Sequence, residues 1–203
     1  ASRGLGDVYK RQVRDHAGTF FWKSKDITMT SLDIHFLHGF GMVGQHSENI
    51  TMDDVDFEAP KESGRTTAGY ADFVQMSGCK GTINISNCTF AGPHDDPINI
   101  HGTFNTVTAI SSDRRTITVQ YNHNETAGFP NFFEGDEIEF MTKGNMITVE
   151  DSVRTVTKVD GPDGMGGNMG DGSGSLTTIK LTLNEAVPVS YTHLRAHETR
   201  SNL

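Results

Sequence analysis

The sequence predicts an all-β protein whose first half coils as a β-solenoid and whose second half is a separate antiparallel unit. Two observations predict this. One apolar pattern recurs three times in the first half, and four strictly alternating segments follow in the second. The composition agrees, because 22 glycines and 21% charged residues are typical of a turn-rich globular protein rather than a disordered one.

The repeat consists of three eight-residue segments that superimpose on one another. They begin at Ile27, Ile50 and Ile83, and each has apolar residues at its first, third, sixth and eighth places. A spacing of two puts side chains on one face of a strand, and the polar pair in the middle marks a bend. Each segment is therefore predicted to be a strand, a corner and a second strand.

The spacing of the copies corresponds to one coil of a solenoid. The second copy starts 23 residues after the first (50 − 27), and the third starts 33 residues after the second (83 − 50), with the surplus in the loop-like stretch 60–69. Helical repeats of this length need apolar residues three and four apart, a spacing that these segments lack. Two interior columns are expected: Ile27, Ile50 and Ile83 in one, and Met29, Met52 and Ile85 in the next.

From Phe104 to Pro188 the pattern changes to short alternating strands separated by turn residues. They span 116–121, 137–141, 154–159 and 178–183. Strict alternation predicts an antiparallel sandwich or small barrel. Its core is expected to contain Ile117, Val119, Ile138, Phe140, Val156, Ile179 and Leu181. The Gly-rich stretch 160–175 is interpreted as a hairpin loop, because it lacks the spaced carboxylates of a calcium loop.

These patterns divide the chain into four parts. Solenoid coils with the candidate site span 13–103, and the antiparallel unit spans 104–188. The end segments 1–12 and 189–203 resemble translated sequencing-adapter read-through of the kind seen in metagenomic fragments, and they are excluded from the fold prediction. The alternative is native termini of unusual composition, which would be supported if both tails packed against the body.

Composition and motifs exclude several classes of function. The net charge of -9 comes without a Lys/Arg cluster, which argues against a nucleic-acid partner. No apolar run approaches the roughly 20 residues of a membrane span, and a signal peptide, if the parent is exported, is expected outside this piece. Cys79 and Cys88 lack the spacing of zinc or redox sites, so buried free thiols are favoured over a disulfide. No metal or cofactor is expected, and no oligomeric state is indicated.

Stacking of coils brings three acids together. Equivalent residues of successive coils lie about 4.8 Å apart. Aligning 43–47 with 73–77 and 97–101 places Gln45, Gln75 and Asn99 in one ladder. In the same register Asp72 lies over Asp96, with Asp95 beside it.

Three convergent carboxylates are suited to acid–base chemistry. Because like charges repel, at least one carboxyl is expected to keep its proton, as a general acid needs, while the other two hold a water. Taken singly, each acid is an ordinary turn residue, but stacking acids without a task costs stability. Strict alternation would point Asp72 inward with Val74 and Met76, so the strand must begin after Asp72 or bulge there.

Several neighbours are candidates for binding a sugar. Gln75 and Asn99 belong to the ladder, and His101 follows the acids, where a hydrogen bond to a hydroxyl and an inert surface position are equally consistent with the sequence. Arg65, Tyr70 and Trp22 could contribute cation or stacking contacts, with packing or solvation as the default interpretation. His94 lies in a turn before the acids, where a loop role is favoured over tuning of the acids.

The stretch 39–51, with Ala71-Asp72, the segment 77–81 and Asp95-Asp96, resembles glycoside hydrolase family 110 over about residues 13–188. The resemblance implies a right-handed parallel β-helix with an inserted β-barrel domain. It also implies exo-acting removal of terminal α-1,3-linked galactose from glycans by inversion, without a metal. The family's three acids fall on Asp72, Asp95 and Asp96. The flanking Gly92-Pro93-His94 and 97–99 depart from the family pattern, which leaves the linkage preference open.

The resulting hypothesis has Asp95 protonating the leaving oxygen while Asp72 and Asp96 orient and deprotonate water. Inversion predicts a gap of roughly 6.5 to 9.5 Å between acid and base. A periplasmic or secreted parent is expected, and because coils of that parent are missing, the fragment alone need not be active. Two alternatives stay open. One is a polygalacturonase-like hydrolase of acidic polysaccharide, which needs cations where the sequence offers Lys80 and Arg65. The other is a noncatalytic glycan-binding β-helix, in which the acids point apart.

Overall fold

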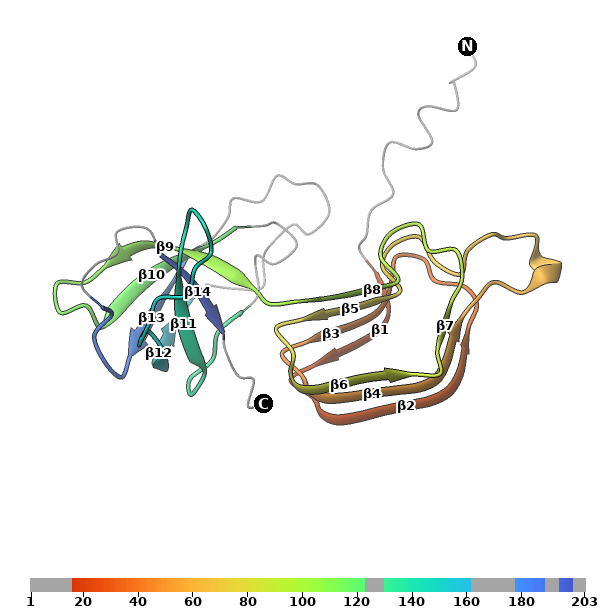
Figure 1. Cartoon of the computed structure of the whole chain (residues 1–203), viewed down its shortest axis with the longest axis horizontal. Helices are drawn as coiled ribbons and strands as arrows, with labels where there is room; N and C mark the ends of the chain where they lie inside the picture. Colours follow the sequence, from red (N-terminus) through yellow and green to blue (C-terminus); the bar gives the residue numbers. More distant parts are fainter. Residues whose placement is uncertain (1–15, 123–129, 162–177, 189–193, 199–203) are drawn as a thin grey trace, which may run out of the picture.

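The computed structural model describes residues 16–122, 130–161 and 178–188 and the backbone of 194–198. Regular structure within these residues is all β, apart from the short 3-10 turn η2 (Lys61–Ser63). The all-β expectation is therefore confirmed. Figure 1 shows two halves, a stack of parallel strands followed by a barrel. No helix in the described part of the chain is long and apolar enough to cross a membrane.

The first half consists of two parallel sheets, and the chain passes from one to the other in each coil. The first sheet contains β1 (Ala17–Trp22), β3 (Phe40–Gln45), β5 (Val74–Ser77) and β8 (Ile98–His101), paired in that order. The second sheet contains β2 (Lys25–Ile34), β4 (Glu48–Phe57), β6 (Lys80–Ser86) and the short β7 (Thr89–Phe90), which pairs with β4.

The predicted interior columns of the second sheet are confirmed. Ile27 pairs with Ile50 and Ile50 with Ile83, while Met29, Met52 and Ile85 form the next column. Side chains of the central coil are fully buried, whereas their neighbours in the outer coils are only partly covered. The stack is thus a core in which each coil shields the next.

Each coil turns at residues whose backbone is left-handed, and these residues form columns of their own. The columns are Lys23, His46 and Gly78; Asp26, Asn49 and Gly81; and Ser31, Asp54 and Asn87. The third column holds the second member of each central polar pair, so the predicted bend is confirmed. A left-handed non-glycine residue costs about 1–2 kcal/mol, and hydrogen bonds between coils offset this. Ser31 Oγ donates to Asp54 Oδ2 at 2.8 Å, and Asn49 Nδ2 donates to Asp26 Oδ1 at 2.8 Å.

The register of the first sheet differs from expectation in one coil. Gln75 pairs with Asn99 as predicted, but Gln45 pairs with Ser77 instead of Gln75. The predicted three-membered ladder is therefore wrong by two residues at Gln45. The left-handed corner sets the register, because His46 N donates to the carbonyl of Ser77 where this strand ends.

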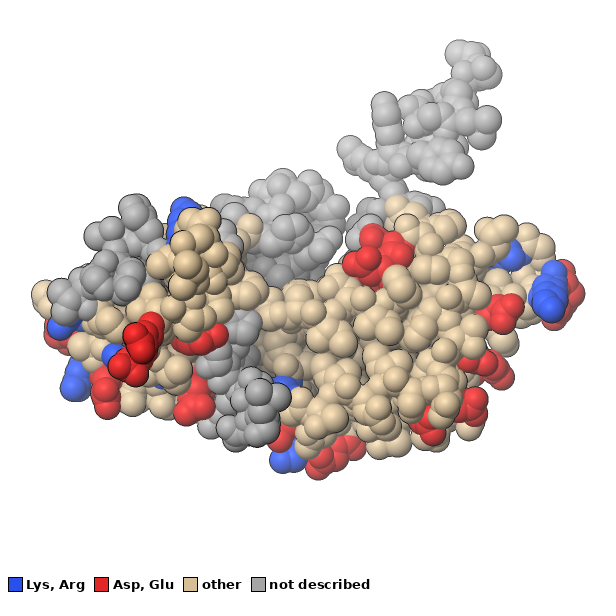
Figure 2. Space-filling view, viewed as in Figure 1, with Lys and Arg blue, Asp and Glu red and all other residues tan. Residues whose placement is uncertain are grey.

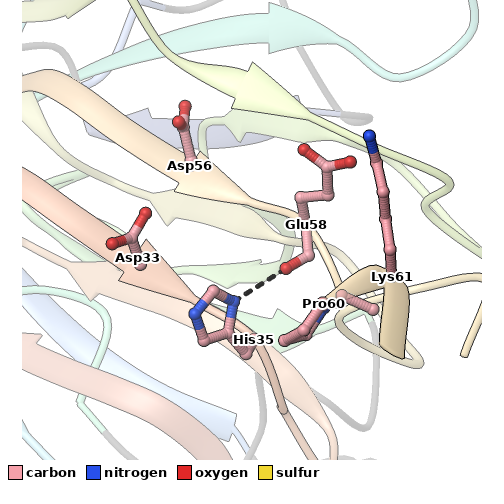
Figure 3. Close-up of a pocket in the computed structure, with 7 residues that line it drawn as sticks. Asp33, His35, Asp56, Glu58, Pro60 and Lys61 are labelled. Atoms are coloured by element: carbon pink, nitrogen blue, oxygen red, sulfur yellow. Dashed lines mark hydrogen bonds between the residues drawn. The ribbon is translucent and has the colours of Figure 1, made fainter. Parts of the chain in front are cut away.

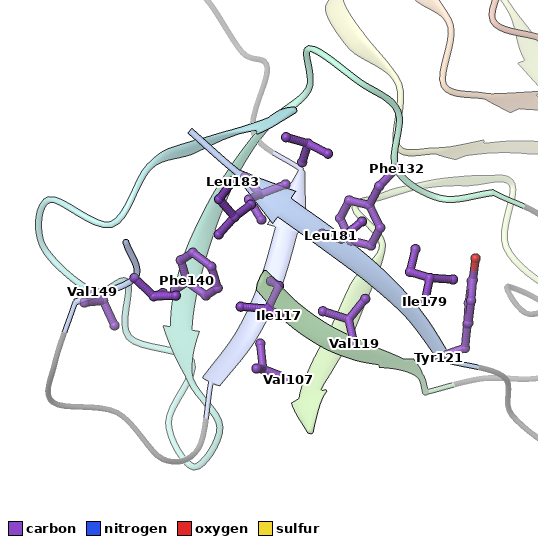
Figure 4. Packing of buried hydrophobic residues seen from close by; sticks show 13 residues of the cluster. Val107, Ile117, Val119, Tyr121, Phe132, Phe140, Val149, Ile179, Leu181 and Leu183 are labelled. Atoms are coloured by element: carbon purple, nitrogen blue, oxygen red, sulfur yellow. The ribbon is translucent and has the colours of Figure 1, made fainter. Parts of the chain in front are cut away.

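The second half is a barrel of six strands. Its ring order is β10, β13, β12, β11, β14 and β9, and β9 pairs with β10. Its strands are β9 (Phe104–Ile110), β10 (Thr116–Tyr121), β11 (Glu137–Thr142), β12 (Arg154–Asp160), β13 (Thr178–Leu183) and β14 (Leu194–Glu198). The seven residues predicted for its core are all buried in one cluster (Figure 4).

The strand β14 lies in the segment 189–203, which was excluded from the fold prediction. Its backbone pairs with β11 over Leu194–Glu198 and with β9 over 195–197. Ladder pairing needs only backbone groups, so an open barrel edge accepts an extended segment of almost any sequence. The foreign origin of this tail therefore stays a prediction. The segment 1–12 and nearly all of 160–175 lie outside the described residues.

A short connection and one aromatic side chain join the halves. Only Gly102 and Thr103 separate β8 from β9. Phe133 of the barrel half meets the ring of Trp22 at 6.2 Å and that of His46 at 5.3 Å between centroids. Lys23 Nζ lies 3.6 Å from the centroid of the Phe133 ring.

Candidate active site

Asp72 is placed by a change in the alternation of its strand. Phe73 and Val74 are consecutive, yet both side chains belong to the interior cluster. The alternation therefore slips by one residue, and Asp72 comes to the face that carries Gln75. β5 begins at Val74, which fulfils the condition that the strand begin after Asp72.

The other two acids come from the next coil. Phe73 N donates to the carbonyl of Asp96 at 3.1 Å, and Val74 N donates to that of Pro97 at 3.2 Å. These bonds continue the ladder of β5 and β8 backward and set Asp96 beside Asp72. One carboxylate oxygen from each of Asp72, Asp95 and Asp96 lies within 4.8 Å of the others.

The three acids differ in their contact with solvent. Asp72 is 4% exposed, Asp95 is half-buried and Asp96 is exposed. Such a cluster can share a proton, hold a water or meet a sugar hydroxyl. Its hard oxygens could also hold a cation, and the described residues contain no second group of three or more His, Cys, Asp or Glu residues with donor atoms this close.

Asn99 and Gln75 adjoin the acids, as the ladder predicted. Asn99 Nδ2 donates to Asp72 Oδ2 at 3.1 Å. Gln75 is the register partner of Asn99, and its Oε1 is buried without a hydrogen-bond partner among the described residues. Tyr70 and His94 flank the acids in the sequence, and their rings meet edge to face with centroids 6.4 Å apart.

The structure does not bring His101 and Arg65 to the acids. His101 ends β8, five residues beyond Asp96, which is roughly 16 Å along an extended chain, and its Nδ1 donates to the Gly102 carbonyl at 3.0 Å. The guanidinium of Arg65 lies 4.7 Å from the centroid of the Phe36 ring. Cys79 and Cys88 are thiols that form no disulfide, as favoured, but both are only half-buried, so the expected burial is wrong.

A separate pocket lies at the end of β2 and β4 (Figure 3) and was not predicted. Its volume is about 230 Å³, and it is lined by Asp33, His35, Asp56, Glu58, Ala59, Pro60 and Lys61. Two polar groups there already have structural partners. Thr89 N donates to Asp56 Oδ1 at 2.9 Å, and His35 Nδ1 donates to the Glu58 carbonyl at 2.9 Å. The sequence signal for this pocket was an Asp at the same place in two successive coils, Asp33 and Asp56. This pattern is equally typical of a solvated strand face.

Comparison with known proteins relates both halves to one group. Residues 116–162, which include β10, β11 and β12, match the family model described as GLAA-B beta-barrel domain II. The chain is 48% identical over 185 residues to "Alpha-1,3-galactosidase A" of Streptomyces avermitilis, an alignment that covers 90% of this chain and 29% of that protein. The predicted resemblance is confirmed.

Further relatives show the same pattern. "Alpha-1,3-galactosidase A" of Peterkaempfera griseoplana is 46% identical over 91% of this chain and 26% of that protein. "Alpha-1,3-galactosidase B" of Bacteroides thetaiotaomicron is 32% identical over 70% of this chain and 23% of that protein. The chain thus spans less than a third of the length of these relatives.

Proposed function

We propose that this relative of the α-1,3-galactosidases A supplies the catalytic acids of a hydrolase that removes terminal α-1,3-linked galactose from glycans. The observation that carries the proposal is the convergence of Asp72, Asp95 and Asp96, whose oxygens lie within 4.8 Å of one another. These are the acids that the family resemblance also selects. In the whole protein, the two parallel sheets would be part of a right-handed parallel β-helix with the barrel inserted, in a periplasmic or secreted enzyme.

The proposed chemistry divides the three acids by role. Asp95 donates a proton to the leaving oxygen, while Asp72 and Asp96 hold and deprotonate the attacking water. Asp95 is half-buried and Asp72 nearly fully buried, so the proposed donor has access to substrate and the proposed water-holding acid is fixed. No cofactor enters these steps.

The spacing of the nearest carboxylate oxygens bears on the stereochemistry of the reaction. The closest oxygens of the three acids are nearer than the roughly 6.5 to 9.5 Å typical of an inverting acid–base pair. One coil spacing separates Asp72 from Asp96, and Asp95 precedes Asp96, so the nearest oxygens are close; the gap between the acid and base carboxyl groups as a whole stays a prediction. Inversion therefore rests on the resemblance alone. NMR of the sugar first released decides it: β-galactose supports inversion, and α-galactose requires a retaining route.

A chimera tests the proposed function directly. The aligned 185 residues of this chain replace the matching stretch of the Streptomyces avermitilis protein, and galactose release is measured on an α-1,3-linked disaccharide. Activity that is lost with Asp95→Asn and kept with Asp33→Asn, in the separate pocket, supports the proposal. A folded chimera that releases galactose equally well with Asp95→Asn contradicts it.

The two alternatives have less support. A hydrolase of acidic polysaccharide needs cations near its acids, but Arg65 packs on Phe36 and Lys80 pairs in register with Glu48. In Figure 2 the Lys and Arg side chains occupy only a few places on the stacked half, where acidic groups are more widespread. The hypothesis of a noncatalytic glycan-binding protein predicted that the three acids point apart, whereas the structure brings their oxygens together.

A further inference from the structure

We infer that Asn99 is a positioning residue that fixes the orientation of Asp72, rather than a group that binds the sugar. The inference deepens the proposed function, on which the catalytic importance of Asp72 rests. The contact itself, from Asn99 Nδ2 to Asp72 Oδ2 at 3.1 Å, is independent of any activity.

The fold brings the two side chains together in two steps. Ile98 and Ile100 of β8 pair with the interior residues Val74 and Met76, so Asn99 between them faces away from the interior. The slip of alternation at Phe73 turns Asp72 to the same face. Asn99 then reaches diagonally across the ladder, from its register partner Gln75 back toward Asp72.

The burial of Asp72 explains why a donor is needed. This carboxyl is only 4% exposed, and a buried carboxylate is costly unless hydrogen bonds replace its water. A bond to an ionised acceptor is stronger than a neutral one. The terminal torsion of an aspartate is otherwise broad, so anchoring Oδ2 narrows the directions in which the carboxylate can hold a water.

The neighbouring Gln75, which was also predicted to bind the sugar, makes no such bond to any acid that the structure describes. Its Oε1 is buried and has no hydrogen-bond partner among the described residues, so a sugar hydroxyl reaches it only if the side chain moves. One of the two N–H groups of the Asn99 amide is engaged by Asp72. The ladder thus pairs one residue that positions an acid with one whose buried acceptor has no partner among the described residues.

Side-chain NMR on the ¹⁵N-labelled 203-residue chain tests the contact without requiring activity. The carboxamide protons of Asn99 should exchange slowly, and Asp72→Ala should speed their exchange at least about tenfold, because a bond to a charged acceptor is lost. Asp72→Asn, which keeps the volume, should shift the Asn99 signal if the alanine variant does not fold. Unchanged Asn99 signals in both variants would overturn the inference.

A matched control lies on the second sheet. Asn49 Nδ2 donates to Asp26 Oδ1 at 2.8 Å, also from one coil to the preceding one. Asp26→Ala should therefore alter the carboxamide of Asn49 and leave that of Asn99 unchanged. A change at Asn99 in this variant would show that its signal reports general loosening of the stack.

Kinetics of the active chimera separate positioning from sugar binding. Asn99→Ala should lower kcat roughly 10- to 100-fold, because misplacement of a reacting group by about 1 Å is that costly, with KM changed less than about threefold. A tenfold rise in KM at unchanged kcat would instead assign Asn99 to the sugar. If Asp95→Asn spares activity, the proposed function fails, while the NMR result on Asn99 and Asp72 still stands.

Discussion

At the scale of the residue, the acidic cluster places three identical side chains in three surroundings. Asp72 is buried and accepts a bond from Asn99, Asp95 is half-buried, and Asp96 is exposed. A general acid must meet both the leaving group and a source of protons, whereas a group that holds water gains from being fixed. These surroundings support the roles proposed for the three acids.

Substitution of the acids should separate their roles. In the chimera, Asp95→Asn should lower kcat/KM on the α-1,3-linked disaccharide by about 10² to 10⁴, the usual contribution of a general acid. An activated aryl galactoside should suffer least, because its leaving group barely needs a proton. Asp72→Asn and Asp96→Asn should impair both substrates alike. If Asp95→Asn reduced activity equally on both substrates and Asp96→Asn spared the aryl substrate, the acid and base roles assigned to Asp95 and Asp96 would have to be exchanged.

Tyr121 in the barrel core should report on alkaline unfolding. Burial raises the pKa of its phenol from the ordinary 10.0 to about 12, so folding favours the neutral form. The associated stability is present below pH 10 and is lost as the pH rises toward 12, to the extent of about 2–3 kcal/mol. Relative to Tyr121→Phe, wild type should therefore lose unfolding free energy between these pH values. Denaturant titrations at pH 9 and 12 measure this, and a constant difference between the two proteins would refute it.

At the scale of the element, the corner columns combine unfavourable backbone with favourable side-chain bonds. Asp53 accepts from Ser86 Oγ at 2.9 Å and from Asn87 Nδ2 at 2.7 Å. These bonds lower the pKa of the Asp53 carboxyl, and the bond from Asn87 has the larger effect. The corner of one coil is thereby tied to the next by an ionised acceptor.

This corner should weaken in acid. Because the pKa of Asp53 is lowered by folding, its contribution is present above the ordinary value near 3.8 and is lost as the pH falls through the lower folded value. As the pH falls from 6 to 2, the melting temperature should decline less for Asn87→Gly than for the unsubstituted chain. The substitution removes the main donor to Asp53, and glycine keeps the left-handed backbone. An undiminished decline in that variant would contradict the assignment.

The elements that the sequence predicted are those with a strict pattern. The columns beginning at Ile27, Ile50 and Ile83 follow from their spacing alone, and β10 to β13 from their alternation. The strand β9 was missed because Asn105 occupies a buried position in it, which hides the alternation. The register at Gln45 was missed because Gln45, the polar residue of β3, was aligned with Gln75 by residue type, whereas the corner at His46 sets the register.

The candidate site was predictable to a similar degree. The 24 residues between Asp72 and Asp96 amount to one coil, so their proximity followed from stacking. The bond from Asn99 to Asp72 did not, because it depends on two consecutive inward residues, Phe73 and Val74, and no periodic pattern announces such a slip. His101 is close to Asp96 in sequence, but five residues of extended chain separate them by roughly 16 Å, and its role in binding stays a prediction.

At the scale of the whole molecule, Phe133 of the barrel half contacts three residues of the stacked coils, and we expect it to hold the two halves together. Phe133→Ala should leave both cores intact but remove the ring that Trp22, Lys23 and His46 contact. Small-angle scattering should then show a wider range of shapes, with faster cleavage near Gly102 in limited proteolysis. The neighbouring Phe132 is buried in the barrel core, and Phe132→Ala should instead destabilise that barrel by about 3–5 kcal/mol. Unchanged scattering of Phe133→Ala would show that the short linker alone fixes the arrangement.

Removal of residues 189–203 should open the barrel between β9 and β11, since β14 lies between them. The unpaired edges offer backbone donors and acceptors to other molecules. The shortened chain should therefore associate with increasing concentration in light-scattering measurements, relative to the intact chain. A shortened chain that stays monomeric at the same concentrations would show that these edges are protected without β14.

Asp72 lies on one coil and Asp95 and Asp96 lie on the next. This arrangement limits where a coil can be added by duplication of part of the gene. A duplicated unit of 23 residues brings its own left-handed corners and apolar columns, so it can join the stack before Gly39 with every ladder repeated. The same unit inserted between Asp72 and Asp96 would preserve the ladders equally well, yet it would move the two acids a further strand spacing of about 4.8 Å apart. Natural selection on activity should therefore tolerate changes in coil number at the ends of the stack and eliminate them at this one junction.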